Sequence, residues 1–490
     1  MMTKLICVYL DFQQISTEVE NIINVKRYGD ILFKKRKLRE YHKELYDKAE
    51  VGEFVHVTDQ RKVADIVNDL RHDKTTYIIL HPASFAVTMP GEFQTFLQKI
   101  KYLDSNISIS DFEIPKPYLV LTAEAAIPVL EEIAKNPDIA DLVLEEKASI
   151  TERFKLEKFY KTIRTAVDFI EFLHTNFEAR YFNSIEKDSL YITKRSDNHK
   201  KMEVESKYYS FLPDDLKAFF LPPFQYTKTA EWSSYKLEKL NIPDCSIQWV
   251  HSSFTEYEFK ILLEKLFLFV RMRPTKAVDE KGQSEVTEKF YIKKVKDRLD
   301  DLKKMPEYGP IADIIRNSTK FSSIDEIFDW YQKEFAAIIK KKNYKPKLAL
   351  SHGDLCLSNM LYDKRISMLK LIDPRGAESQ EGLYFDSYYD VAKLSHSILG
   401  DYDLVNNGLF DLVYDNNLKV RLSTDALLNK EALQKMFTKF LEDQGFDYDL
   451  VRIFEASLFI SMLPLHIDNP KKVMGFVLNA IKILEYISQK

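Results

Sequence analysis

The side chains between residues 352 and 359 are of the types that phosphoryl transfer requires. The segment begins His352-Gly353-Asp354, and Asn359 follows the aspartate by five residues. Transfer of a phosphoryl group from a nucleoside triphosphate needs a carboxylate near the acceptor hydroxyl, oxygen ligands for Mg²⁺ and a cation on the phosphates. Asp354 is the predicted catalytic base, and Asn359 is a predicted metal ligand. An ordinary turn with a capping Asp and Asn is the plainer alternative.

A second acid follows a short apolar run. Residues 369–372 (LKLI) predict a strand that leads into Asp373-Pro374-Arg375-Gly376. A carboxylate at the end of a strand is held rigidly, and Mg²⁺ prefers oxygen ligands. Asp373 is therefore the second predicted metal ligand.

These two segments together resemble a known family. Residues 351–376 are similar to the catalytic and metal loops of the aminoglycoside phosphotransferase/choline kinase family, a branch of the protein-kinase-like fold. Gly353, where protein kinases have arginine, is typical of that branch. The resemblance implies ATP and Mg²⁺ as cofactors and a small-molecule hydroxyl as the acceptor.

The resemblance continues downstream in residues 385–392 (FDSYYDVA), which are similar to the family's GDPxYDLA segment. Phe385 and Ser387 stand where the family has Gly and Pro. In the family the later acid supports the catalytic loop through hydrogen bonds, which implies a structural role for Asp390.

The cation for the phosphates is predicted on residues 189–195. Alternation along this predicted strand puts Leu190, Ile192 and Lys194 on one face, so two apolar residues would line an adenine pocket with the ammonium beyond them. A solvent-facing lysine on an edge strand is the alternative.

The partner of Lys194 is predicted on the following helix, residues 200–212. Glu205 shares a helix face with aromatic and apolar residues at i+3, i+4 and i+7, so it should point inward. Glu203 has Lys207 at i+4 and is the reserve candidate on the solvent side.

The rest of the nucleotide site is predicted from backbone positions. Residues 235–240 predict the last strand and hinge of a small lobe, with backbone groups near Glu238 and Leu240 at the adenine edge. No glycine occurs between residues 91 and 282, so a glycine-rich phosphate loop is missing there. The missing loop favours a small-molecule kinase over a eukaryotic-type protein kinase. Ser184 or backbone amides of its turn are the predicted phosphate contacts instead.

In the family the acceptor lies between the catalytic loop and the helices that follow it, so the resemblance implies an acceptor site there. Candidate contacts are Arg375, His396, Asp401, Asp403, His466 and Asp468, with structural roles as the alternative. Residues 461–470 break a helix with two prolines and resemble sequences linked to bacterial surface-polysaccharide synthesis. The formal net charge of -4 mildly favours a neutral or cationic acceptor.

A chain of 490 residues is long for one hydrophobic core. Short apolar runs alternate with helical patterns in residues 1–145, which predicts an α/β domain with a mostly parallel sheet. A boundary is expected at residues 140–155. Residues 155–490 predict an α+β protein-kinase-like domain with a small β-rich lobe at about 180–250 and a helical lobe at about 251–490.

The first domain resembles nucleotide-sugar pyrophosphorylase-type nucleotidyltransferases at the level of the fold. Their glycine-rich turn after the first strand is missing, because here Asp11-Phe12-Gln13-Gln14 follows. The domain is therefore interpreted as a degenerate nucleotidyltransferase that serves packing, assembly or substrate delivery.

Composition excludes several classes of function. The slightly negative net charge argues against a dedicated nucleic-acid binder, and no apolar run approaches the roughly 20 residues of a membrane span. Three scattered cysteines fit a reducing setting, so the predicted location is the cytoplasm.

The leading hypothesis is an ATP- and Mg²⁺-dependent kinase acting on a sugar, an amino alcohol or a hydroxylated amino acid. A nucleotide-binding pseudokinase that binds a partner, and a bifunctional kinase–nucleotidyltransferase, are the alternatives. Retention of the three catalytic-loop groups counts against the former, and the missing glycine-rich turn counts against the latter.

Overall fold

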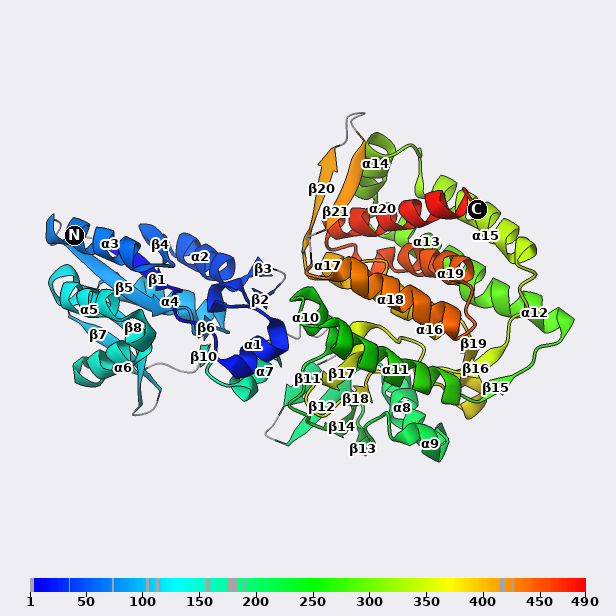
Figure 1. The fold of residues 1–490 in the computed structure, drawn as a ribbon, viewed down its shortest axis with the longest axis horizontal. Coiled ribbons are helices and arrows are strands. Elements are labelled where there is room, and N and C mark those ends of the chain that lie inside the picture. Colours follow the sequence, from blue (N-terminus) through cyan, green and yellow to red (C-terminus); the bar gives the residue numbers. More distant parts are fainter. Residues whose placement is uncertain are drawn as a thin grey trace. The chain divides into compact units, whose positions relative to one another are not determined.

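The computed structural model describes residues 4–34, 36–72, 75–102, 105–111, 114–155, 159–174, 184–187, 190–414, 419–424 and 427–490. Contacts divide the chain into two compact units, Met1–Glu178 and Ala179–Lys490. Figure 1 shows both units with their helices and strands labelled.

The first unit is built on a six-stranded sheet in the order β4-β1-β5-β8-β7-β9. Its strands are β1 (Lys4–Leu10), β4 (Glu53–Val57), β5 (Thr76–Pro82), β7 (Ile107–Asp111), β8 (Ile114–Thr122) and β9 (Glu152–Lys155). β1 pairs in parallel with β4 and β5, whereas β8 runs antiparallel to both of its neighbours. The predicted mostly parallel sheet is therefore mixed, because β7 and β8 are consecutive strands that pair as a hairpin.

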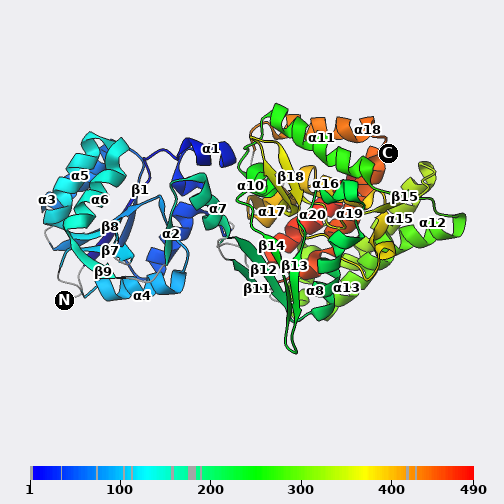
Figure 2. The same cartoon turned by 90° about the horizontal axis from the view of Figure 1, so that it is seen from below.

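Helices cover both faces of this sheet. The helices are α1 (Thr17–Ile23), α2 (Leu38–Lys48), α3 (Gln60–His72), α4 (Pro90–Ile100), α5 (Ala123–Lys135), α6 (Ala140–Ile150) and α7 (Ala166–His174). Along β1, Cys7 and Tyr9 join the core beneath α2 and α4, while Val8 and Leu10 join the core beneath α3 and α5. Figure 2 shows strands lying between these two helix groups. Burial on both faces explains the continuous apolar run at the start of the sequence.

The predicted boundary at residues 140–155 is wrong. β9 pairs with β7, and β10 (Tyr160–Thr162) pairs with β6 (Phe85–Val87). Phe159, Phe169 and Phe172 are buried in the core of the first unit. β9 and β10 are therefore edge elements that return to the first unit, and α7 belongs to it as well.

The second unit begins with the small β-rich lobe that the sequence predicts. Its antiparallel sheet has the order β11-β12-β14-β13, with β11 (Ser184–Lys187), β12 (Tyr191–Ser196), β13 (Phe224–Lys228) and β14 (Ser233–Glu238). Between β12 and β13 lie α8 (His199–Lys207), the 3₁₀ turn η3 (Tyr208–Phe211) and α9 (Asp214–Lys217). Lys194 is paired with Tyr235 across the sheet and Ile192 with Leu237, so these four side chains share one face.

The helical lobe follows, as predicted. Its helices are α10 (Cys245–Val250), α11 (Glu256–Met272), α12 (Glu280–Thr287), the π-helix η4 (Glu288–Lys293), α13 (Lys294–Lys304), α14 (Tyr308–Ser318), α15 (Ile324–Lys341), α16 (Tyr389–Ile398), α17 (Tyr402–Asn406), α18 (Lys430–Asp443), α19 (Tyr448–Ser461), η7 (Leu463–His466) and α20 (Pro470–Ile487). α19 and α20 lie in its main core and are buried over most of their length. A helix that is apolar on most of its surface must be enclosed by others.

Short strands are inserted into the helical lobe. They are β15 (Thr275–Lys276), β16 (Leu348–Leu350), β17 (Met360–Asp363), β18 (Met368–Leu371), β19 (Tyr384–Asp386), β20 (Phe410–Tyr414) and β21 (Val420–Thr424). The hairpin of β20 and β21 was not predicted, because a helical lobe is expected at about 251–490.

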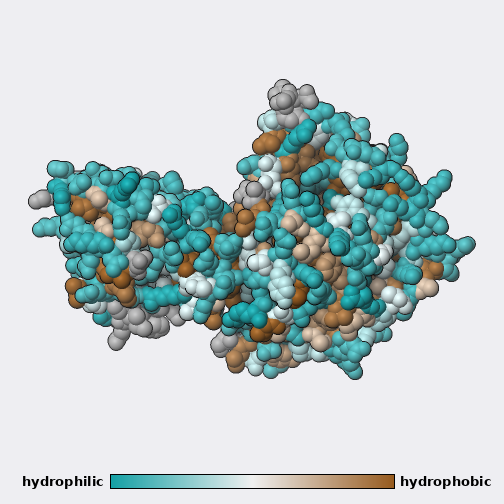
Figure 3. Space-filling model, viewed as in Figure 1, coloured by the Kyte–Doolittle hydropathy of each residue, from teal (hydrophilic) through white to brown (hydrophobic). Residues whose placement is uncertain are grey.

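The surface in view is mainly hydrophilic on both units, with scattered hydrophobic areas (Figure 3). Among the residues that the structure describes, no helix combines the length and the apolar character needed to cross a membrane.

The extent of the first unit can be tested with fragments. We expect the fragment 1–178 to unfold cooperatively and the fragment 1–150 to be unfolded. The shorter fragment lacks three buried Phe side chains, each worth roughly 3–5 kcal/mol, against a total stability of about 5–15 kcal/mol. Thermal unfolding followed by circular dichroism measures this. Equal transition temperatures for the two fragments would contradict the assignment.

Candidate active site

The loop that carries Asp354 is held in place by a buried carboxylate. Asp390, near the start of α16, is fully buried and accepts hydrogen bonds from the backbone N–H groups of His352 and Gly353, both at 2.9 Å. Arg273, just after α11, donates to the same carboxylate at 2.9 Å and to the Ser387 carbonyl at 3.1 Å. Asp390 therefore supports the loop, as the resemblance implies, whereas the contribution of Arg273 was not predicted.

The loop is also tied to the segment after β18. His352 Nε2 lies 2.9 Å from the Ile372 carbonyl oxygen, and the Arg375 N–H donates to the His352 carbonyl at 2.7 Å. Gly353 has φ +81°, and a Cβ there would lie 2.6 Å from Arg375 Cβ. The glycine is therefore required both by its left-handed backbone and by this close approach.

Asp354 and Asn359 lie in direct contact. The Asn359 amide NH₂ group donates to the Asp354 carbonyl at 2.9 Å and to its carboxylate at 3.2 Å. Lys393 Nζ lies 2.8 Å from the other carboxylate oxygen. Lys393 was missed by the sequence analysis, although its position three residues after Asp390 on one helix face was a usable signal.

Asn359 and Asp373 are brought together by the β17–β18 hairpin. Met360 pairs with Leu371, and the Ile372 N–H donates to the Asn359 carbonyl at 2.9 Å. Asp373, the next residue, has φ +55°, a left-handed conformation that is uncommon for a residue with a side chain. Such backbone outliers cluster at functional sites. Two oxygen donors predicted to bind a metal thus lie at one end of the hairpin.

Lys194 lies between two carboxylates. Its Nζ is 2.7 Å from Asp373 Oδ1 and 3.1 Å from Glu205 Oε2, and the Tyr235 hydroxyl donates to Glu205 at 3.0 Å. Burial lowers the pKa of Lys194, but Asp373, Tyr235 and Glu205 raise it well above its usual value. Burial raises the pKa of Asp373, and Lys194 brings it below its usual value. Both groups are therefore charged at neutral pH.

Helix α8 packs against the loop of Asp373. A Cβ on Gly376 would lie 2.3 Å from the backbone carbonyl of Val204 in α8. The Tyr208 hydroxyl, in the turn after α8, donates to the Ser351 carbonyl at 3.1 Å. Because Glu205 lies on this helix, the distance between the helix and the loop sets the geometry of the Lys194 ion pairs. Glu203 instead pairs with Lys207 on the exposed face.

A pocket opens next to Asp373. Its lining is mainly aromatic and aliphatic and comprises Glu205, Tyr208, Tyr209, Phe220, Leu221, Pro223, Tyr235, Leu237, Leu371, Ile372, Asp373 and Pro374. The predicted apolar face of β12 is only partly correct, since Leu190 precedes the strand and is 62% exposed. The Lys239 N–H donates to the Leu190 carbonyl at 2.8 Å, so the pairing of β12 with β14 continues one residue past Glu238.

One predicted nucleotide contact cannot be placed. The backbone of Ser184 pairs with Arg195 in the small sheet, but its side chain lies outside the described residues.

The predicted acceptor contacts differ in their exposure. Arg375 is exposed next to Gly353, with its guanidinium 5.8 Å from the centre of the Phe385 ring. His396 and Asp403 are buried in the helical lobe at 1% and 0% exposure, which corrects the prediction that they contact the acceptor. The prediction for these two residues was wrong because helix packing decides which face of α16 and α17 is enclosed. The sequence does not reveal that packing.

The remaining candidates make packing or ionic contacts. His466 lies with its ring 5.2 Å from that of Phe476. Asp401 accepts a hydrogen bond from Lys430 at 2.7 Å, and Asp468 is exposed.

Comparisons with known proteins give the following. No protein-family model and no curated protein matches the chain. Solved structures similar to it include an aminoglycoside phosphotransferase from Streptomyces rimosus with ADP and streptomycin (13% identity, TM-score 0.34, covering 57% of this chain and 92% of that one). Another is a putative fructosamine-3-kinase from Haemophilus somnus (12% identity, TM-score 0.37, covering 62% of this chain and 87% of that one). A third is a glucosamine kinase with glucosamine, ADP and phosphate (10% identity, TM-score 0.36, covering 65% of this chain and 85% of that one). At this level of similarity they do not define the activity of this chain.

The packing of α8 on the Asp373 loop can be tested at Gly376. We expect Gly376→Ala to destabilise the protein by about 1–3 kcal/mol, because the new methyl group meets backbone that cannot rotate away. Gly309→Ala is the matched control, since nothing lies within 4 Å of its added Cβ and a helical alanine is favourable by roughly 0.5–1 kcal/mol. Denaturant unfolding measures both variants. A Gly376→Ala protein as stable as the control would contradict this packing.

The support of the loop that carries Asp354 can be tested at Asp390. We expect Asp390→Ala to cost roughly 3–5 kcal/mol, because Arg273 is left buried without its carboxylate and two loop amides lose their acceptor. Asp411→Ala removes an exposed acid paired with Lys471 and should leave stability unchanged. The free energies of unfolding decide the matter, and similar values for the two variants would refute the supporting role.

Proposed function

We propose that this chain is an ATP- and Mg²⁺-dependent phosphotransferase that phosphorylates a hydroxyl group of a small molecule. The observation that carries the proposal is the Lys194–Asp373 contact, which joins residues 179 positions apart. It links a lysine held by Glu205 to an aspartate beside Asn359 and the Asp354 loop. This is the set of groups that phosphoryl transfer from a nucleotide requires.

In this proposal Lys194 binds the phosphates of ATP and Glu205 holds the lysine in position. The apolar face formed by Ile192 and Leu237 contacts the adenine, and backbone groups near Glu238 and Leu240 bind its edge. Ser184, at the start of β11, or backbone amides next to it contact the phosphates. The face that Ile192 and Leu237 share with Lys194 supports this arrangement.

The residues present fit a magnesium ion. Mg²⁺ is commonly held by one or two protein oxygen ligands together with phosphate oxygens and water. Asp373 offers a carboxylate, and Asn359 donates its NH₂ group to Asp354, which turns the amide oxygen away from that residue. When bound, the ion would neutralise charge on the phosphates.

The reaction would proceed by in-line displacement. The acceptor oxygen forms a bond to the γ-phosphorus while the bond to the β–γ bridging oxygen breaks, and ADP leaves. The hydroxyl proton goes to the Asp354 carboxylate, which the Asn359 amide and the Lys393 ammonium orient. Asp354 is 40% exposed, which leaves it accessible to an acceptor.

Finer assignments extend the proposal. The acceptor is a sugar, an amino alcohol or a hydroxylated amino acid, and the resemblance of residues 461–470 suggests a role in bacterial surface-polysaccharide synthesis. The three cysteines are free and buried, which supports action in the reducing cytoplasm.

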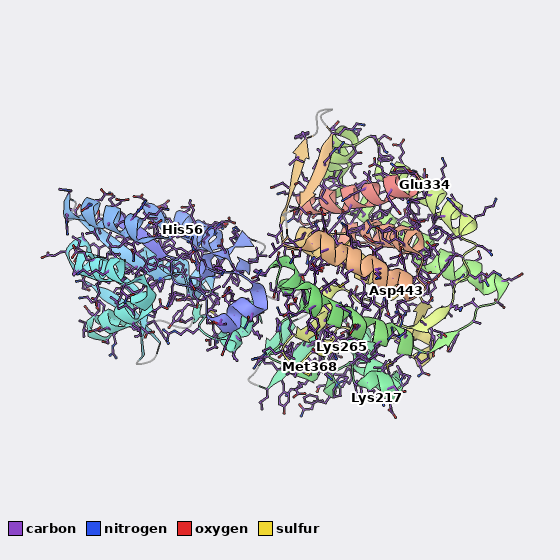
Figure 4. All side chains as sticks on the ribbon, viewed as in Figure 1. His56, Lys217, Lys265, Glu334, Met368 and Asp443 are labelled. Atoms are coloured by element: carbon purple, nitrogen blue, oxygen red, sulfur yellow. The ribbon has the colours of Figure 1, made fainter. Side chains whose placement is uncertain are left out.

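We propose that the first unit is not itself catalytic. Where a nucleotidyltransferase would have a glycine-rich turn, β1 is followed by Asp11, whose carboxylate is buried. It accepts a hydrogen bond from the Gly29 N–H at 3.0 Å and lies 2.9 Å from His56 Nε2 (His56 is labelled in Figure 4). An acid occupied in this way supports a structural role for the turn.

The central test is Asp354→Asn, which keeps the shape of the side chain and removes the proton acceptor. We expect turnover to fall about 100-fold or more while ATP affinity is retained. ADP formation from Mg-ATP is measured with a panel of sugars, amino alcohols and hydroxylated amino acids. Asp214→Asn, at an acid 93% exposed on α9, is the control.

Other outcomes of that assay separate the alternatives. ATP binding without ADP formation by the wild-type protein would favour a nucleotide-binding pseudokinase. Release of pyrophosphate would favour a nucleotidyltransferase. Equal turnover by wild type and Asp354→Asn would exclude Asp354 as the base.

A further inference from the structure

Three cations gather around the ring of Tyr389, and one of them contacts Asp354. Lys393 Nζ contacts the Asp354 carboxylate at 2.8 Å, and Lys294 Nζ contacts the Tyr389 hydroxyl and lies 4.9 Å from the centre of its ring. Arg375 lies over Phe385, whose ring is 5.3 Å from that of Tyr389. We call Lys294, Arg375 and Lys393 the cationic cluster.

The cluster is not neutralised by the carboxylates around it. Asp354 pairs with Lys393, and the Asp390 carboxylate is occupied by Arg273 and two backbone amides. Within the described part of the chain, neither Lys294 nor Arg375 forms an ion pair with a carboxylate. Three positive charges against one negative charge leave an excess of about two beside the proposed catalytic base.

This excess charge has a free-energy cost. Burial lowers the pKa of Lys294, and the neighbouring Lys393 and Arg375 lower it further against the opposing effect of Tyr389. Burial raises the pKa of the Tyr389 hydroxyl, but Lys294, Lys393 and Arg375 together bring it below its usual value. Partly buried cations that repel one another are stabilised by an anion placed among them.

The backbone before Lys294 is unusual in a way that matches a binding role. The π-helix η4 immediately precedes α13, and Lys294 is the first residue after it. π-helical turns are rare and occur frequently at functional sites. Lys293, the preceding residue, pairs with Asp297 and is 64% exposed, whereas Lys294 contacts Tyr389 inside the lobe. The register of the helix therefore directs one lysine of an adjacent pair toward Tyr389.

We infer that the acceptor carries a phosphate monoester, which Lys294 and Arg375 bind while its hydroxyl lies at Asp354. This inference rests on the proposed phosphotransferase function and specifies its substrate class. A phosphate monoester at neutral pH has close to two negative charges, which match the excess of the cluster, whereas a carboxylate supplies one. Arg and Lys are the side chains that bind phosphate most effectively.

The inference replaces the neutral or cationic acceptor expected from the net charge of the whole chain. Net charge averages over the surface, while a ligand responds to the charges within a Debye length of about 8–10 Å. Upstream, a reaction that phosphorylates a polyol or sugar would supply such an acceptor.

The test measures binding of a small phosphate monoester independently of turnover. The wild-type protein is saturated with Mg²⁺ and a non-hydrolysable ATP analogue, so that Lys194 is occupied, and is then titrated by calorimetry with glycerol 3-phosphate, glycerate or glycerol. We expect glycerol 3-phosphate to bind at least about 10-fold more tightly than glycerol and more tightly than glycerate. Lys294→Met should weaken its binding about 10-fold or more.

Two further variants make the result decisive. Lys293→Met removes the adjacent exposed charge and should leave binding unchanged. Arg375→Gln, at an exposed position, tests the same cluster if Lys294→Met does not fold, and it should also weaken glycerol 3-phosphate binding.

The outcomes distinguish this inference from the proposed function. Failure of the ATP analogue to bind, with glycerol 3-phosphate binding still sensitive to Lys294 and Arg375, would support the anion site and refute the kinase. Equal affinity for glycerol 3-phosphate in wild type, Lys294→Met and Arg375→Gln, or no preference over glycerol, would overturn the phosphate acceptor. Asp354-dependent ADP formation with uncharged acceptors would, in that case, leave the kinase standing.

Discussion

The candidate site of the second unit depends on the ammonium group of Lys194. It is 6% exposed and lies between the carboxylates of Glu205 and Asp373. A buried cation is tolerated only when it is paired, so the strand, the helix and the loop that supply these three groups must meet in one arrangement. Gly376 permits the close approach of α8 that makes this meeting possible.

The loop that carries Asp354 depends on a second buried charge, that of Asp390. Asp390 accepts two backbone N–H groups from the loop and is paired with Arg273. One turn along the same helix, Lys393 contacts Asp354. Helix α16 therefore both supports the loop and provides a cation for the proposed base, which couples the conformation of the loop to its electrostatics.

The charge distribution near Asp354 contrasts with that of the chain as a whole. The sequence is slightly acidic, yet cations from α13, the segment after β18 and α16 surround Tyr389. A separation of local from overall charge is expected where a site binds a charged ligand, because only nearby groups act strongly on it. At the end of β1 in the first unit, by contrast, the charged group has partners within the protein. The Asp11 carboxylate contacts the Gly29 N–H and the His56 ring.

Several features could be predicted from sequence because they depend on local spacing. Alternation along a strand and periodicity along a helix placed Lys194 and Glu205 on inward faces, where the structure pairs them. The short spacing from Asp354 to Asn359 constrains both to one loop, and the apolar run before Asp373 forms β18. The order of a small β-rich lobe and a helical lobe likewise follows from the sequence of local patterns.

Other features were decided only by the tertiary structure. The first unit extends to residue 178 because β9 and β10 pair with strands that lie more than 40 residues earlier. The burial of His396 and Asp403 and the convergence of Arg273, Lys294 and Lys393 depend on which helix faces meet. Local sequence determines which face of an element is apolar or charged. The partner of that face is selected by long-range packing, which no local pattern contains.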